Sequence, residues 1–131
     1  MLQLIYEPRA LLDRVAAALE PGGVVGIGVS NIRSTGARLF GGAWRGLGLP
    51  RHISHFTPET LERLLEWAGF EVVARRYETP RWVVAGSVDA ALPAPRPVRR
   101  AAKAGLYAAK EVWGRTRYAD TMEVYARLRR R

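Results

Sequence analysis

The stretch from Thr57 to Tyr77 reads TPETLERLLEWAGFEVVARRY, and it predicts a helix followed directly by a strand. Thr57 suits the N-cap position and Pro58 suits the first helical residue. Apolar residues then recur at helical spacing, namely Leu61, Leu64, Leu65 and Ala68. Gly69 ends the helix, and the apolar residues at the start of Phe70 to Tyr77 indicate a strand.

A helix, a tight turn and a strand are also predicted upstream of this unit. The apolar spacing favours a helix from Glu7 to Leu19, and the Pro-Gly-Gly sequence after it favours a turn. The run from Val24 to Val29, VVGIGV, holds no polar residue, which is typical of a strand buried on both faces of a parallel sheet. Residues 31–55 are irregular and rich in glycine, and they leave room for a short helix from Ser34 to Phe40.

The downstream part of the chain predicts one more helix and one more strand. Residues 79–90 favour no single structure, and Pro93, Pro95 and Pro97 indicate a stiff connector. A helix is predicted from Val98 to about Trp113, and Thr121 to Leu128 alternates as a half-buried strand does. Alternating helices and strands predict a single α/β domain with helices covering a sheet.

The composition excludes several classes of protein. The 131 residues contain no cysteine, so the chain has no disulfide and no thiolate chemistry, as is common in cytoplasmic proteins. The first residues lack the basic start of a signal peptide. No apolar run approaches the roughly 18 residues that span a bilayer. We therefore expect a cytoplasmic protein.

The positive charge is concentrated near the end of the chain. The net charge is +9, and from Arg96 onward eleven lysines and arginines face three acidic residues, an excess of eight. Such a stretch can contact nucleic acid, an anionic lipid surface or another polyanion. The alternative is a solvated helix face followed by a basic tail.

Four segments of the chain match the motifs of one protein family. Leu19 to Val25, LEPGGVV, is similar to the turn that opens the fifth strand of that family, and Val29-Ser30-Asn31 is similar to its V-P-N. Leu49 to Thr57 is similar to a P-R-H-x-x-H-F-[ST] motif, and Thr60 to Val72 to a T-L-x-x-L-L-x-x-A-G-F-x-V unit. Taken together, in order and at the family's spacing over residues 8–73, these segments resemble the class I S-adenosylmethionine-dependent methyltransferases of one bacterial branch, the type 11/12/23-like group.

The resemblance implies a partial Rossmann-like sheet made of the family's strands 5, 6 and 7. In that order the fifth strand neighbours the antiparallel seventh, and the sixth is outermost. It also divides the single domain of residues 1–131 into a best-matching core, a variable connector and a basic helix with the final strand, at residues 1–78, 79–97 and 98–131.

The cofactor-binding half of the family pattern has no counterpart in these residues. Leu2 to Pro8 aligns with the segment that follows the fourth strand, with Gln3 and Leu4 in place of Glu and His. The family's Gly-x-Gly-x-Gly loop and ribose-binding carboxylate precede that segment. Gly26-Ile27-Gly28 is not that loop, because it lies inside a predicted strand and opens no helix.

Two functions follow from the resemblance. The first is the acceptor-side half of a methyltransferase, inactive alone or dependent on an N-terminal half, with S-adenosylmethionine as the family's cofactor but not bound by the isolated chain. The alternative is a non-catalytic binding or dimerisation module whose basic C-terminus contacts an anionic partner. Whether the chain is itself an enzyme, which methyl acceptor it takes, and whether it is a natural short protein, a misassigned start or a gene fragment are left open.

The candidate site consists of Asn31, Arg51, His52 and His55. Ligands of open α/β sheets bind beyond the carboxyl ends of the strands, where Asn31 lies and toward which the Arg51 to His55 loop can fold. His52, Arg51 and His55 are candidates to orient the acceptor or take its proton, and Asn31 is a weak candidate for cofactor contact. Each can instead brace the loop. Two histidines without an acidic partner predict no metal site.

The same strand order predicts self-association. Without a fourth strand, Val24 to Val29 forms an edge that carries no charge or proline, and such edges recruit partners. We therefore expect a homo-oligomer, with a separate N-terminal half as the alternative. The four tryptophans are expected in the core or at subunit contacts, or else around an acceptor pocket, namely Trp44, Trp67, Trp82 and Trp113.

Overall fold

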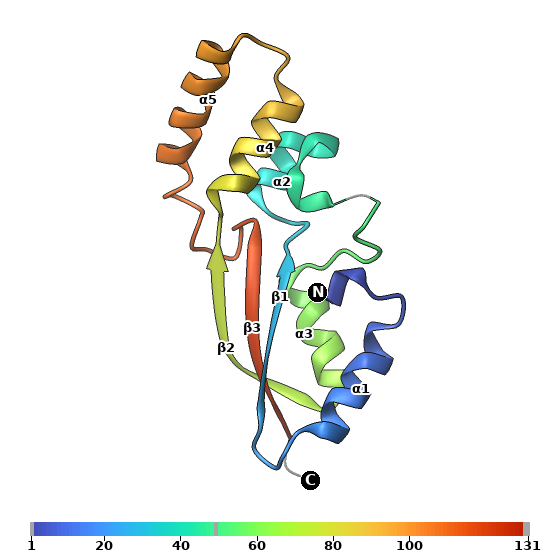
Figure 1. The fold of residues 1–131 in the computed structure, drawn as a ribbon. Helices are drawn as coiled ribbons and strands as arrows, with labels where there is room; N and C mark the ends of the chain where they lie inside the picture. Colours follow the sequence, from blue (N-terminus) through green and yellow to red (C-terminus); the bar gives the residue numbers. More distant parts are fainter. Residues whose placement is uncertain (1, 49, 130–131) are drawn as a thin grey trace.

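The computed structural model describes residues 2–48 and 50–129 (Figure 1). Leu49 of the proposed loop motif, and Arg130 and Arg131 of the basic stretch, lie outside the described residues. The elements in chain order are η1 (Leu2–Leu4), α1 (Pro8–Ala18), β1 (Val24–Ser30), α2 (Thr35–Phe40), η2 (Gly41–Ala43), η3 (Arg45–Leu47), α3 (Pro58–Trp67), β2 (Phe70–Glu78), α4 (Arg81–Ala91), α5 (Arg96–Ala109) and β3 (Thr121–Leu128).

The three strands form one sheet in the order β1-β3-β2. β3 is antiparallel to both neighbours, so β1 and β2 point the same way and end at the same edge. Val24 pairs with Arg127 and Ser30 with Thr121, while a β-bulge between Val72 and Ala74 shifts the register of β2. This is the predicted order of the fifth, seventh and sixth strands, which is confirmed.

Helices α1 and α3 cover one face of the sheet (Figure 1). Leu12 of α1 and Leu61 and Leu65 of α3 are almost fully buried against the inward residues of the strands. The Thr57 N-cap is confirmed: its side chain accepts from Thr60 N–H, and the Thr60 hydroxyl accepts from Thr57 N–H. Gly69 follows α3 with φ of 88°, a conformation that favours glycine.

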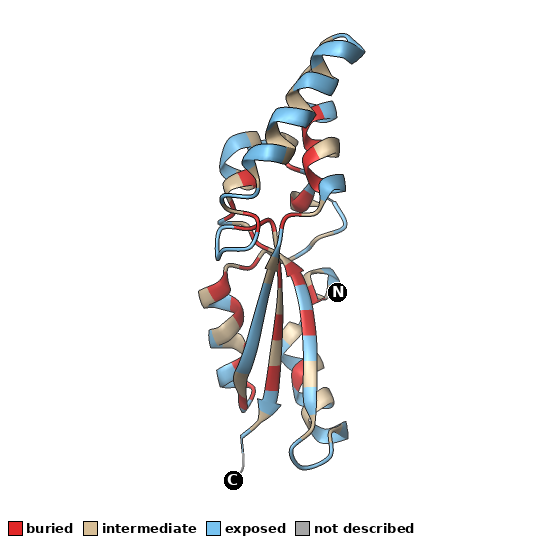
Figure 2. Ribbon diagram, turned by 90° about the vertical axis from the view of Figure 1, so that its left-hand side faces the viewer, coloured by how far each residue is buried: buried red, intermediate tan, exposed pale blue. Residues whose placement is uncertain are grey.

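The expectation that Val24 to Val29 is buried on both faces is wrong. Ile27 and Val29 are buried, but Val24, Gly26 and Gly28 lie on the other face and are exposed (Figure 2). Glycine contributes no side chain, so two solvent-facing positions of the run looked apolar in the sequence. A Cβ at Gly26 would lie 3.2 Å from the Tyr125 ring, which occupies that space.

The segment after β2 is more helical than the sequence indicated. Residues 79–97 contain α4, and Pro97 lies in the first turn of α5, where its missing N–H costs little. α5 ends at Ala109 rather than near Trp113, and turns follow it. α4 and α5 form a hairpin beyond the end of the sheet, near α2 (Figure 1).

None of the helices in the described part of the chain has both the length and the apolar character that crossing a bilayer requires.

Candidate functional site

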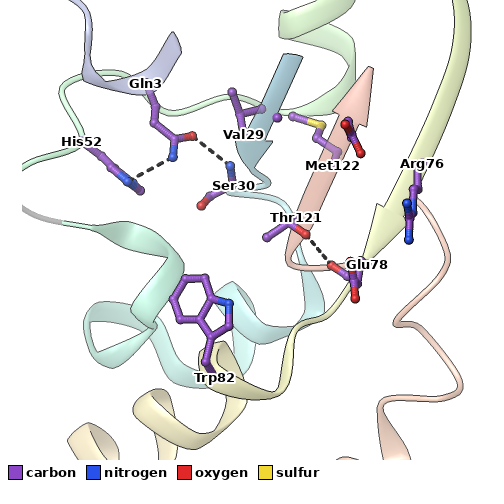
Figure 3. A pocket seen from close by; sticks show the side chains of 11 residues that line it. Gln3, Val29, Ser30, His52, Arg76, Glu78, Trp82, Thr121 and Met122 are labelled. Carbon is purple, nitrogen blue, oxygen red and sulfur yellow. Dashed lines mark hydrogen bonds between the residues drawn. The ribbon is translucent and has the colours of Figure 1, made fainter. Parts of the chain in front are cut away.

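A cavity of about 330 Å³ lies where β1 and β2 end and β3 begins (Figure 3). The connection after β1 and the loop before α3 meet at this edge, where Asn31 bridges Phe56 and Ile32 N–H donates to the Phe56 carbonyl. The predicted return of that loop to the sheet edge is therefore confirmed. The cavity is lined by Gln3, Gly28, Val29, Ser30, His52, Arg76, Glu78, Trp82, Thr121, Met122 and Glu123.

His52 lines this cavity and belongs to a chain of hydrogen bonds. Ser30 N–H donates to Gln3 Oε1 at 2.9 Å, Gln3 Nε2 lies 3.0 Å from His52 Nε2, and His52 Nδ1 lies 3.2 Å from the Gly46 carbonyl. The carbonyl only accepts, so Nδ1 carries the proton; the Gln3 amide only donates from nitrogen, so Nε2 accepts. The contacts thus select the neutral Nδ1–H tautomer.

The electrostatics agree with that tautomer. Burial lowers the pKa of the His52 imidazole, and the nearby His55 lowers it further, against the opposing effect of the hydrogen bond to the Gly46 carbonyl. Protonated His52 would also direct an N–H at the Gln3 amide nitrogen, which cannot accept it. His52 is therefore a neutral base at the cavity wall near pH 7.

His55 and Arg51 lie apart from the cavity wall. The His55 ring centre is 6.4 Å from that of His52, and its Nε2 donates to the Leu47 carbonyl at 2.9 Å. Arg51 is exposed. The structure therefore brings the two histidines together, with His52 alone of the two lining the cavity.

Asn31 is wholly buried, and both its side-chain amide nitrogen and its side-chain oxygen form hydrogen bonds within the protein. Its amide donates to the carbonyls of Arg117 at 2.8 Å and Ala119 at 3.0 Å, and its Oδ1 accepts from Arg33 N–H at 3.0 Å. These contacts tie the end of β1 to the segment before β3.

A buried polar cluster around Asp120, directly before β3, was missed by the sequence reasoning. Asp120 Oδ1 accepts from Trp44 Nε1 at 2.7 Å and from the Ser34 hydroxyl at 3.0 Å, and all three residues are buried. Gly36 lies so close to Asp120 that a Cβ there would meet the carboxylate at 2.0 Å. The acidic residue directly before the final strand was the available signal.

Trp82 is one of the four tryptophans named as candidates for an acceptor pocket, and it lines the cavity although α4, the helix that carries it, was not predicted. The residue is 63% exposed, and its indole lies at the wall of the cavity opposite Gln3 and Ser30 (Figure 3). Of the other tryptophans Trp44 is buried, Trp67 is 68% exposed and Trp113 is half-buried. Trp82 is thus the tryptophan that lines this cavity.

The described residues do not fit a cradle for S-adenosylmethionine. Gly26 and Gly28 lie inside β1, as expected, and open no helix. Asn31 has its amide and carbonyl oxygen occupied by backbone groups. Among residues 2–48 and 50–129, no group of three or more His, Asp or Glu side chains is placed to hold a metal ion.

The strand order and the cavity at the strand ends are those of an α/β domain of the Rossmann-like class. Among solved structures, the chain is similar to the [4+2]-cyclase SpnF, with a TM-score of 0.56 and 21% identity, over 98% of this chain and 46% of that one. It is similar to a SAM-dependent methyltransferase from Archaeoglobus fulgidus with a TM-score of 0.51 and 16% identity, over 92% and 52%. The chain thus spans about half of each structure.

The chain belongs to the methyltransferase domain family, whose model matches residues 1–75. The comparison with curated proteins gives no match. The family match covers η1 to most of β2, which includes His52 and the strand ends at the cavity.

Proposed function

We propose that the chain is the acceptor-side half of a SAM-dependent methyltransferase domain and that the cavity at the strand ends receives the methyl acceptor. The observation that carries the proposal is His52, held as a neutral imidazole at the wall of that cavity within the segment that matches the family. The likeness to a cyclase as well as to a methyltransferase is a likeness of fold, so the chemistry is argued from the site.

In this proposal His52 has to take up only one proton. Methyl transfer to an O–H or N–H group releases one proton from the acceptor, and a neutral imidazole within reach can take it. An acceptor that replaces the Gln3 amide at His52 Nε2 would place its own proton on that nitrogen. Trp82 and the carboxylates of Glu78 and Glu123 would shape and orient the acceptor at the other walls.

S-adenosylmethionine is the cofactor that the family implies, and it would supply the methyl group. The described residues offer no cradle for it, so we propose that residues outside these 131 hold it and that the chain alone is inactive. Calorimetric titration of the purified chain with S-adenosylmethionine should show no useful affinity. A dissociation constant in the low micromolar range would refute this part of the proposal.

The role of His52 is tested in a reconstituted or full-length protein by comparing His52→Ala with His55→Ala. Loss of a general base typically lowers turnover by about 10²-fold or more. We expect such a loss for His52→Ala and a turnover within a few fold of wild type for His55→Ala, because His55 braces the same loop without lining the cavity. A sharp fall in melting temperature with unchanged turnover for His52→Ala would show a purely structural role.

A further inference from the structure

The α4–α5 hairpin projects beyond the sheet and carries a strong positive charge (Figure 1). From Arg81 to Trp113 it holds six basic residues and two acidic ones, an excess of four. α5 has no buried residue, and its contacts with other elements are chiefly those with α4. The surface of α5 is therefore mostly free in this structure (Figure 2).

One side of α5 is apolar and exposed. Val98, Ala101, Gly105 and Ala108 follow one another at helical spacing and are all exposed, with Val98 at 50%. Ala102 and Leu106, on the neighbouring side of the helix, are the half-buried apolar positions. The apolar arc of α5 is thus wider than the part that α4 covers.

The opposite side of α5 is basic. Arg96, Arg99, Arg100 and Lys103 line a groove of about 620 Å³ together with Tyr107 and Asp89 of α4. Asp89 binds Lys103 at 2.8 Å and Arg99 at 3.3 Å, and this bonding lowers the pKa of the Asp89 carboxyl.

Two arginines of this groove stay available. Arg96 and Arg100 are exposed, and neither forms an ion pair within residues 2–48 and 50–129. At the other end of the groove the Arg81 guanidinium lies 4.7 Å from the centre of the Tyr107 ring and so joins the two helices. The hairpin is therefore braced while Arg96 and Arg100 face solvent.

We propose that the α4–α5 hairpin docks on an anionic lipid surface, with α5 lying in the plane of the interface. An exposed apolar arc opposite a basic row is the pattern of interfacial helices, whose apolar face enters the acyl boundary while cations of the polar face contact lipid phosphates. This binding is independent of methyl transfer and of the proposed acceptor cavity.

Charge complementarity favours a lipid surface over two other occupants. A second copy packed on α5 would bring the same basic row against itself, and like charges repel at short range. A nucleic acid would satisfy Arg96 and Arg100 but would leave the apolar arc in water. A membrane with anionic headgroups offers lipid phosphates to the basic side of the helix and acyl chains to its apolar side.

The test is co-sedimentation of the purified chain with vesicles of phosphatidylcholine alone or with about 30% phosphatidylglycerol, at low and at physiological salt. The variant Arg96→Gln/Arg100→Gln removes two exposed charges, and Val98→Gln/Ala101→Gln removes apolar surface at constant charge. The matched control is Arg14→Gln/Arg63→Gln, which removes two exposed charges from α1 and α3. Circular dichroism of each variant verifies folding.

We expect the affinities of the wild type and the control for the anionic vesicles to agree within twofold, and we expect neither protein to bind the neutral vesicles. The α5 arginine variant should bind about thirtyfold more weakly, because each of the two cations near such a surface contributes about 1 kcal/mol. The glutamine pair on the apolar side should weaken binding at least about threefold.

Three results would overturn the proposal. The first is failure of the wild type to bind anionic vesicles at low salt. The second is an equal loss in the control, which would assign binding to net charge alone. The third is binding to duplex DNA at least as tight as to vesicles with no effect of the apolar substitutions, which would identify a polyanion site.

Discussion

At the scale of single residues, Gln3 decides the chemistry of His52. Its amide joins the end of β1 to the imidazole, so it fixes both the position and the tautomer of that ring. In the resemblance to methyltransferases this position aligns with a glutamate. The sequence named His52 as a candidate, but the partner that holds it is 49 residues away and only the folded chain shows the contact.

Replacing Gln3 with glutamate should reverse the protonation preference of His52. A carboxylate at hydrogen-bond distance favours imidazolium, and an opposite charge this close raises a pKa by about 1–3 units. The His52 pKa, lowered in the wild type, should therefore rise above its usual value in Gln3→Glu. Proton NMR titration of the His52 ring in the wild type and in the variant measures it. An unchanged His52 titration would contradict the hydrogen-bond chain.

The same substitution should change how stability depends on pH. In the wild type the folded pKa of His52 is below that of the unfolded chain, near 6.5. Its contribution to stability is thus present above about pH 6.5 and is lost as pH falls through that value toward the folded pKa. In Gln3→Glu the contribution should instead be largest below pH 6.5 and be lost as pH rises through the raised pKa. Urea denaturation from pH 5 to 8 distinguishes the two.

Replacing Asp120 should lower the free energy of unfolding more than replacing an exposed acidic residue does. Asp120→Ala leaves the Trp44 indole N–H and the Ser34 hydroxyl buried without their acceptor, which costs about 2–3 kcal/mol. Asp120→Asn keeps an acceptor oxygen and should cost less. Asp13→Ala, which breaks an exposed pair with Arg9, should lie within about 1 kcal/mol of wild type. Equal denaturation midpoints for the Asp120 and Asp13 alanine variants would refute this role.

At the scale of elements, α3 has the clearest local signal, and its cap should be measurable. The Thr57 hydroxyl accepts the Thr60 N–H, so Thr57→Ala should lower the free energy of unfolding by about 1 kcal/mol. Thr57→Ser keeps the acceptor and should lose at most a few tenths. Chemical denaturation compares the pair. Identical stability of the alanine and serine variants would show that the cap contributes nothing.

The elements that the sequence predicted well are those whose patterns are local. The limits of α1, α3, β2 and β3 agree with the predictions to within about two residues, because caps, turns and periodicity mark them. α4 was missed because its signals conflict. It follows Pro80 without a side-chain cap and mixes valine with alanine, glycine and serine, and its buried residues face η3 and α2, whose positions the sequence does not give.

The burial of β1 shows a different limit. An apolar strand was interpreted as covered on both faces, but coverage is a property of the other layers and not of the strand. Glycine at two of the outward positions concealed the alternation that would have marked a half-buried strand. Part of the candidate site could not be predicted for the same reason. Trp82, Thr121 and Glu123 line the cavity only because α4 and the order of the strands bring them there.

At the scale of the whole molecule, β1 forms one of the two edges of the sheet. β1 pairs with β3 on one side, and within the described residues no strand lies on its other side. Gln3 receives the Ser30 N–H near one end of that edge. The face that carries Val24 is also left without a covering helix, with Val24 at 53% exposure. An uncharged edge beside an open face is the kind of surface on which chains associate.

We therefore predict that the purified chain is not monomeric at micromolar concentration, and a two-fold dimer joined at β1 is the simplest assembly. Light scattering coupled to gel filtration should give at least twice the 14.6 kDa chain mass. Val24→Lys places a charge where β1 begins and should shift the population toward monomer, because charged edge strands resist pairing. Leu39→Lys, at an exposed apolar site on α2, should leave the mass unchanged. A folded wild type at the monomer mass would refute the prediction. Equal effects of the two lysines would move the interface away from β1.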